Sequence, residues 1–185
     1  AAPKKEGKNT KEISRSHKVI TSDNGLVTIT GGKWTSYRLM AEDTVDKAIE
    51  VCGLPKRKCV TKKFRIHGYR KNPDLTDHMY VYGSDEPKIL RLIEQEPALG
   101  EKLSQKFGYT LAEVVWAVRE EMAITLEDVL ARRVRMLFVD AREAMAAAPK
   151  AAAIMARELG RDQAWIDEQV KSFTDLAKNY IFEQK

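Results

Sequence analysis

The chain has 185 residues, of which 43% are hydrophobic and 32% are charged, values that are ordinary for a globular protein in water. No apolar run approaches the roughly 18–20 residues of a membrane span. The only cysteines, Cys52 and Cys59, show no CxxC spacing and have no histidine pair nearby, which argues against a zinc site. We therefore expect free thiols, an intracellular setting and no bound metal.

The charge is distributed unevenly along the chain. Residues 1–71 carry 17 Lys and Arg against 7 Asp and Glu, whereas residues 72–185 carry 15 against 20. Gly68 and Pro73 interrupt the chain close to this change. We therefore predict two parts, residues 1–71 and residues 72–185.

The first part contains strand signals and one helix. The runs "HKVIT" (17–21) and "LVTIT" (26–30) are rich in β-branched residues, and the Asn-Gly at 24–25 is a strong signal for a hairpin turn. A helix is predicted from Trp34 to Cys52, where Gly53 and Pro55 end it. The basic stretch that follows reads as an extended connector.

The second part is predicted to be almost entirely helical. Thr110 and Glu113 have the spacing of a capping box, and Thr125 is a second cap. The predicted helices cover residues 86–95, 98–106, 110–122, 125–148 (interrupted by Pro149), 150–159 and 162–182. The fold class is therefore mainly α: a helical C-terminal domain of about six helices, preceded by a short β-hairpin and a helix.

Several residues with chemical potential read more simply as structural. Trp116 and Trp165 fall on apolar helical stripes, which favours core packing. Arg133 lies on the apolar stripe of its helix and requires a carboxylate partner, for which Glu120, Glu121 and Asp128 are candidates. The histidines (His17, His67 and His78) have no mutual helical spacing and read as loop or surface residues. The basic run at 56–65 reads as a solvated loop, not a nucleic-acid site.

One turn suggests a binding function. In "VTITGGKWTSYRLMA" a strand leads into Gly31 and Gly32, then Lys33, and a helix starts at once. Paired glycines let a flat ligand approach the main chain, and the start of the helix presents N–H donors and its positive dipole end. A phosphate or the electron-rich edge of a reduced flavin fits such a site. Tight packing without a ligand is the alternative.

The same stretch resembles the C-terminal signature of FAD-dependent glycerol-3-phosphate dehydrogenases. That signature is Gly-Gly-Lys, two residues, a small residue, Tyr-Arg, two residues and Ala, and residues 31–41 comply with it throughout. The upstream "ISRSHKV" is similar to the family's substrate-site arginine segment, and "REEMAITLEDVLARRVRMLF" is similar to its helical C-terminal domain. The resemblance extends from about Lys11 onward, so that residues 1–71 correspond to the end of the FAD-binding domain.

The resemblance implies a membrane-peripheral enzyme that oxidises sn-glycerol 3-phosphate to dihydroxyacetone phosphate, with electrons passing through FAD to a quinone. It implies flavin contacts at Gly31, Gly32, Lys33, Trp34 and Thr35. It also implies that Arg15 and Lys33 bind the substrate. The catalytic residues are not identified.

The sequence lacks the dinucleotide fingerprint G-x-G-x-x-G, so we expect this chain alone to be inactive and not to bind FAD. The implied partners are glycerol 3-phosphate, a quinone and the N-terminal remainder of the same enzyme, with no nucleic acid. The implied location is cytoplasmic, peripheral to the inner face of the cell membrane. The alternative is a helical module for protein or membrane interaction, without catalysis of its own.

Overall fold

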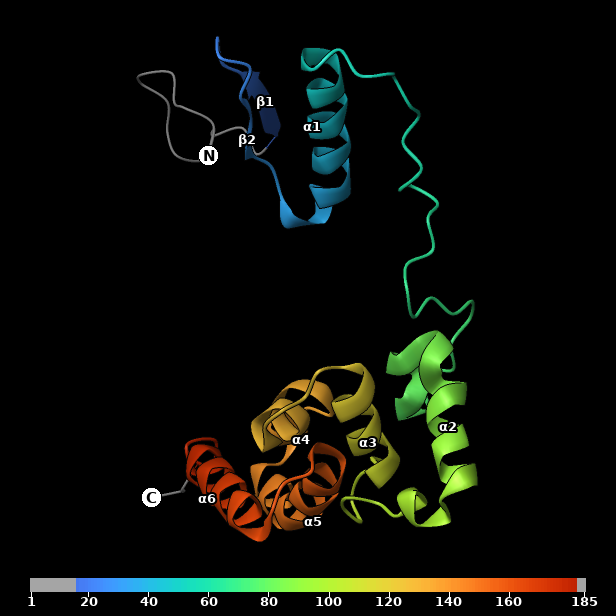
Figure 1. Ribbon diagram of the computed structural model, residues 1–185, viewed down its shortest axis with the longest axis vertical. Coiled ribbons are helices and arrows are strands. Elements are labelled where there is room, and N and C mark those ends of the chain that lie inside the picture. Colours follow the sequence, from blue (N-terminus) through green and yellow to red (C-terminus); the bar gives the residue numbers. More distant parts are fainter. Residues whose placement is uncertain (1–15, 183–185) are drawn as a thin grey trace. The chain divides into compact units, whose positions relative to one another are not determined.

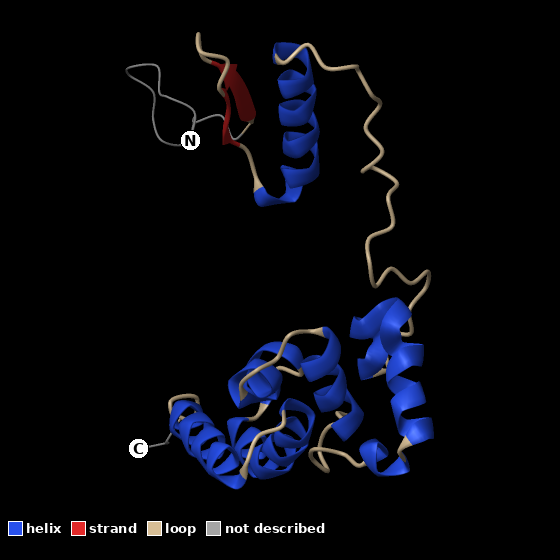
Figure 2. Cartoon of the chain, in the orientation of Figure 1, coloured by secondary structure: helices blue, strands red, loops and turns tan. Residues whose placement is uncertain are grey.

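The structure, a computed structural model, describes residues 16–182 (Figure 1). It contains two compact units, which divide between Ile66 and His67. The first holds a hairpin and one helix, and the second is helical (Figure 2). The prediction of a mainly α chain with a short hairpin and a helix at its start is confirmed.

The hairpin consists of β1 (His17–Thr21) and β2 (Val27–Gly31), which pair antiparallel with His17 opposite Gly31. In the turn, the Ser22 N–H donates to the Leu26 carbonyl at 3.0 Å. Gly25 takes a φ of +83°, a left-handed conformation that suits glycine in such a turn. The predicted hairpin is confirmed.

The helix after the hairpin begins with a 3₁₀ turn, Trp34–Ser36, and continues as α1 (Tyr37–Val51). This helix packs beside both strands (Figure 1). No residue of the described part of this unit, 16–66, is buried. Three elements of this size form one contact layer, and they enclose no core of their own.

The helical unit begins with 3₁₀ turns over His78–Asp85, which bend at Gly83, where φ is +53° and ψ is −117°. Next come α2 (Glu86–Gln95), a 3₁₀ turn at Pro97–Gly100 and α3 (Leu111–Glu120). The capping box at the start of α3 is confirmed, because the Thr110 N–H donates to Glu113 Oε2 at 2.7 Å.

The helix predicted over 98–106 is wrong beyond Gly100. Residues 101–110 instead form a loop in which Lys102 and Thr110 make an isolated antiparallel bridge. The Leu103 N–H donates to the Tyr109 carbonyl at 2.8 Å, so the donors that a helix would use are satisfied across the loop. The Lys106 ammonium lies 3.0 Å from the carboxylate of Glu143, which is near the start of the long helix Ala141–Leu159, and this ion pair holds the loop to that helix.

The continuous helix predicted from Thr125 to Pro149 is also wrong. A helical turn at Leu126 leads into a π-helix over Asp128–Arg133. Arg135 then takes a left-handed conformation, with a φ of +58°, and the helix that follows it, α4 (Met136–Val139), is short. The helix α5 (Ala141–Leu159) then runs through the proline without a break. Pro149 lies on the exposed face of α5, so the carbonyl that lacks an N–H partner can be hydrated.

The last helix is α6 (Gln163–Lys178), which Asp162 caps by accepting the Trp165 N–H at 3.0 Å. Gly160 ends α5 in the left-handed conformation, as its position predicts. α5 packs against α3, α4 and α6 (Figure 1). The buried face of α5 is mostly alanine, which lets its neighbours approach closely. Larger side chains from α3, α4, α6 and the segment 126–133 fill the core. These are Val114, Val115, Leu126, Leu130, Met136, Leu137 and Phe173.

Candidate functional site

The Gly-Gly turn follows β2 directly. Gly31 and Gly32 have φ values of +79° and +86°, a region that other residues rarely adopt. A Cβ on Gly31 would lie 2.8 Å from the Ser16 carbonyl oxygen, and one on Gly32 would lie 2.6 Å from the Met40 sulfur. Close packing against the chain's own atoms therefore accounts for both glycines, whether or not a ligand is bound.

The helix start that follows is open to solvent. Lys33, Trp34 and Thr35 are all exposed, and Trp34 retains 89% of its accessible surface. The Lys33 N–H donates to Ser36 Oγ at 3.3 Å and the Ser36 N–H donates to the Lys33 carbonyl at 3.0 Å, whereas the N–H groups of Trp34 and Thr35 have no carbonyl one turn earlier to accept them. The Lys33 ammonium forms no ion pair with any residue between 16 and 182. Within residues 16–182 the turn thus presents a cation without an ion pair and the main-chain donors of Trp34 and Thr35.

A side-chain pair that the sequence did not predict, His17 with Asp43, lies next to the Gly-Gly turn. His17 on β1 and Asp43 on α1 lie 2.5 Å apart, Nε2 to Oδ2, and the His17 ring is largely buried. A Cβ on Gly32 would lie 3.2 Å from the His17 Cβ, so this pair adjoins the turn. His17 is therefore not the loop or surface residue that the sequence indicated. Its side chain connects the hairpin to the helix and holds the turn in place.

Arg15, the other predicted substrate residue, lies outside the described residues. The five predicted flavin residues, Gly31 to Thr35, form one continuous turn, as their adjacency requires. Their predicted roles stay predictions. Next to them, Arg38 pairs with Glu42 at 2.5 Å, so this arginine is already neutralised within its own helix.

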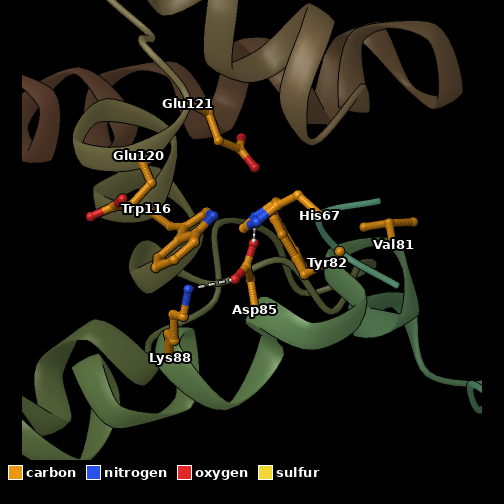
Figure 3. Close-up of a pocket in the computed structure, with 9 residues that line it drawn as sticks. His67, Val81, Tyr82, Asp85, Lys88, Trp116, Glu120 and Glu121 are labelled. Atoms are coloured by element: carbon orange, nitrogen blue, oxygen red, sulfur yellow. Dashed lines mark hydrogen bonds and ion pairs between the residues drawn. The ribbon is translucent and has the colours of Figure 1, made fainter. Parts of the chain in front are cut away.

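The helical unit contains a separate cavity of about 380 Å³ near the start of α2. Figure 3 shows the Asp85 carboxylate between His67 and Lys88. The Trp116 ring and the Glu121 side chain also line the cavity. Asp85 is buried, accepts a hydrogen bond from His67 and lies 2.8 Å from the Lys88 ammonium. Lys88, followed by His67, lowers the pKa of Asp85.

Glu121, in the same cavity, has its pKa raised, chiefly because it is buried. Its neighbour Arg133 donates to the Glu121 carbonyl oxygen and lies 3.7 Å from its carboxylate, which confirms the predicted ion pair of Arg133. Carboxylates with opposite pKa shifts can mark an acid–base site, but structural ion networks also produce them. Here Asp85 has His67 and Lys88 as partners, Glu121 has Arg133, and Glu120 is exposed to solvent, so we interpret the cavity as an ion network that stabilises the helical unit.

A second network surrounds Glu113, whose side chain is fully buried. Glu113 accepts hydrogen bonds from the Thr110 N–H, from Tyr82 at 3.1 Å and from His78 at 3.1 Å. Burial, together with the charge of Glu113, raises the pKa of the Tyr82 hydroxyl, which therefore stays protonated and donates. His78 is half-buried and fastens the 3₁₀ segment to α3, a role its sequence position did not reveal.

This contact predicts a pH dependence of stability. The hydrogen bond to Glu113 raises the pKa of His78 above 6.5, so His78 binds a proton more tightly in the folded state than in the unfolded state. The resulting stabilisation is complete below about pH 6.5 and is lost as the pH rises through the raised pKa of the folded state. Urea unfolding of the parent and of His78→Gln, at about pH 6 and about pH 8.5, should show a smaller pH difference in the variant. Equal pH differences would contradict this.

No group of three or more His, Cys, Asp or Glu side chains that could hold a metal ion occurs in residues 16–182. Cys52 and Cys59 are free thiols. No helix within the same range is long and apolar enough to cross a membrane.

Comparison with known proteins places the chain in a family. The profile described as the C-terminal domain of alpha-glycerophosphate oxidase (DAO_C) matches residues 28–166. The probable mitochondrial glycerol-3-phosphate dehydrogenase of Caenorhabditis elegans is 34% identical over 94% of this chain and 26% of its own length. The corresponding Dictyostelium discoideum protein is 32% identical over 94% of this chain and 29% of its own length. The mitochondrial glycerol-3-phosphate dehydrogenase of Mesocricetus auratus is 34% identical over 94% of this chain and 26% of its own length.

The chain therefore spans about a quarter of the length of these relatives. The matched profile begins in β2 and ends in the first turn of α6, so it includes the Gly-Gly-Lys turn, α1 and the helical unit as far as residue 166. The family resemblance read from the turn is confirmed. This chain belongs to the family of the C-terminal domain of alpha-glycerophosphate oxidase, and it corresponds to a C-terminal portion of glycerol-3-phosphate dehydrogenases.

Proposed function

We propose that this chain is the C-terminal segment of a flavoenzyme that oxidises sn-glycerol 3-phosphate to dihydroxyacetone phosphate and passes the electrons through FAD to a quinone. The observation that carries the proposal is the exposed turn at Gly31–Thr35, which presents a free lysine and main-chain donors inside the region that matches the family. The relatives are named glycerol-3-phosphate dehydrogenases, which supports the substrate.

The donor chemistry of the turn fits an anionic flavin edge and a substrate phosphate. FAD, when bound, supplies the hydride acceptor and the route for electrons to the quinone. Of the main-chain N–H groups at 32–35, those of Gly32, Trp34 and Thr35 would donate to the electron-rich edge, because that of Lys33 donates to Ser36, and the helix start adds a positive dipole end. Lys33 would hold the substrate phosphate or the oxygen on its C2 carbon, and Arg15 is proposed to share this task.

The first unit needs further protein to cover it, which supports the N-terminal remainder of the same enzyme as its partner. None of residues 16–66 is buried, although many are large and apolar. The exposed apolar side chains in this unit are Ile20, Leu26, Trp34, Tyr37, Leu39, Val45, Val51, Leu54, Val60, Phe64 and Ile66. Apolar surface of this extent favours association with another surface.

The proposed quinone acceptor is dissolved in a lipid bilayer, so the whole enzyme must reach a membrane surface. We propose peripheral contact, with the inner face of the cell membrane as the location. The names of the relatives describe them as mitochondrial, which makes the mitochondrion the competing location. Fractionation of cells that express the full-length protein distinguishes these two locations.

The full-length protein tests the proposed reaction. Purified with its N-terminal remainder, it should carry flavin that glycerol 3-phosphate bleaches without oxygen and that a quinone then restores. A flavin that glycerol 3-phosphate leaves oxidised would contradict the proposed substrate. A reduced flavin that oxygen reoxidises but a quinone does not would contradict the acceptor alone.

The isolated chain is expected to take up no flavin, because the sequence has no G-x-G-x-x-G cradle for the pyrophosphate of FAD. The measurement is the visible absorbance of the purified chain after incubation with FAD and gel filtration, with the full-length protein as the positive control. Stoichiometric flavin in the isolated chain would show that residues 1–185 suffice for binding.

A further inference from the structure

A second cavity in the helical unit, of about 530 Å³, lies where the segment around α4 faces the 3₁₀ turns at His78–Asp85. Its walls are mostly aromatic or aliphatic, and the other lining residues are His78, Glu113, Arg133 and Arg135. The wall residues are Tyr80, Val81, Tyr82, Tyr109, Val134, Phe138 and Val139. A mostly apolar hollow of this size with a few polar groups is typical of small-molecule sites.

The charged side chains that line the cavity are not equivalent. Glu113 is satisfied by Thr110, Tyr82 and His78, so its charge is screened from the cavity. Arg133 is held by Glu121. Arg135, in contrast, forms no ion pair with any residue in the described range. Its guanidinium instead lies 5.9 Å from the centre of the Phe138 ring.

The backbone conformation at Arg135 is also unusual. Arg135 has φ +58° and ψ +20°, a left-handed conformation that glycine or asparagine adopts more readily. It follows the π-helix Asp128–Arg133, which interrupts what would otherwise be regular helix. The result is a guanidinium that has no ion pair among the described residues, in the lining of an aromatic hollow that also includes the exposed rings of Phe138 and Tyr80.

We propose that this cavity binds a small organic anion: a flat, apolar or aromatic body that carries one carboxylate or phosphate. The aromatic walls would stack on the body, and Arg135 would pair with the anionic head in a charge-assisted hydrogen bond. All lining residues belong to the helical unit, so this proposal does not rest on the turn at Gly31–Thr35.

The test uses the full 185-residue chain and two probes, phenyl phosphate and benzoate, followed by amide and aromatic NMR shifts. At least one probe should saturate and shift resonances of Tyr109, Arg135 and Phe138. Inorganic phosphate and phenol, which supply the head or the body alone, should each bind at least about tenfold more weakly. Absence of saturation, or shifts confined to other residues, would overturn the proposal.

Variants locate the binding. Arg135→Gln keeps a side chain of similar reach and should weaken binding of the probe about tenfold or more, since a charged hydrogen bond is lost. Arg161→Gln removes the same charge from an exposed arginine outside the cavity and should leave the affinity unchanged. Thermal unfolding establishes that both variants remain folded. Equal affinities for the parent and Arg135→Gln would overturn the proposal.

A second copy of the chain is the competing occupant of this surface. Sedimentation velocity over a range of protein concentrations decides between the two. The chain should stay monomeric at the concentrations used for the titration. A dimer that Phe138→Ser dissociates, and that the probes do not dissociate, would show that the surface is a self-interface and would overturn the proposal.

Discussion

Replacing Gly83 by alanine is expected to destabilise the helical unit more than any other single glycine substitution in it. A Cβ at this position would lie 1.8 Å from the Gly68 carbonyl oxygen, an overlap with main chain that no rotamer relieves. The backbone there has φ +53° and ψ −117°, which an alanine adopts only under strain. The substitution would also displace the Gly68 carbonyl that accepts the Ser84 N–H at 3.2 Å.

Strain and overpacking each cost on the order of 1–3 kcal/mol, so we expect a loss of about 2–6 kcal/mol in the free energy of unfolding and a fall in Tm on the order of 10 °C. Gly160→Ala is the matched control. Gly160 has a φ of +64°, but a Cβ there would meet no atom within 4 Å, so only the local strain of about 1 kcal/mol applies. Calorimetric melts of both variants measure the difference, and equal melting temperatures would refute the steric explanation.

Removing the charge of Lys33 in the full-length enzyme is expected to lower kcat/KM for glycerol 3-phosphate by about 10- to 150-fold. The estimate follows from the ~1.5–3 kcal/mol that a hydrogen bond to a charged group contributes. Lys33 is exposed, follows Gly32 directly and forms no ion pair within the described part of the chain, so no internal partner competes for it. Lys33→Met keeps the apolar stem and deletes the ammonium.

Stopped-flow reduction of the flavin by glycerol 3-phosphate measures the rate of reduction and the substrate concentration at half-saturation. The rate should fall and the half-saturation concentration should rise. Lys171→Met, at an exposed position on α6, removes one positive charge from the helical unit and should leave both unchanged. A Lys33→Met enzyme within about twofold of its parent would remove Lys33 from the site. It would leave the turn with a structural role only.

Local signals were sufficient for several elements of the fold. The hairpin followed from two β-rich runs around Asn24-Gly25, and α3 followed from the capping box of Thr110 with Glu113. α2 occupies the predicted range, residues 86–95. These elements depend on interactions between residues close in sequence, which a pattern can represent.

For the candidate site, the residues that adjoin one another in sequence were predictable and those joined through space were not. The Gly-Gly-Lys motif itself identifies the turn and the family. The contact of His17 with Asp43 spans 26 positions, and that of His78 with Glu113 spans 35. Neither has a periodic spacing, so no pattern in the chain reveals that these side chains meet.

The sequence by itself therefore determined the family, the helical class and the position of the Gly-Gly-Lys turn. Only the tertiary structure decided the path from Thr125 to Leu159. There the helical periodicity is continuous, yet Arg135 takes a left-handed conformation and Asp140 begins a new helix by capping the N–H groups of Arg142 and Glu143. Packing of Leu130, Met136 and Leu137 into one core outweighs the preference for a straight helix, because burying each such side chain contributes about 1.5–3 kcal/mol, more than the propensity differences between ordinary residues.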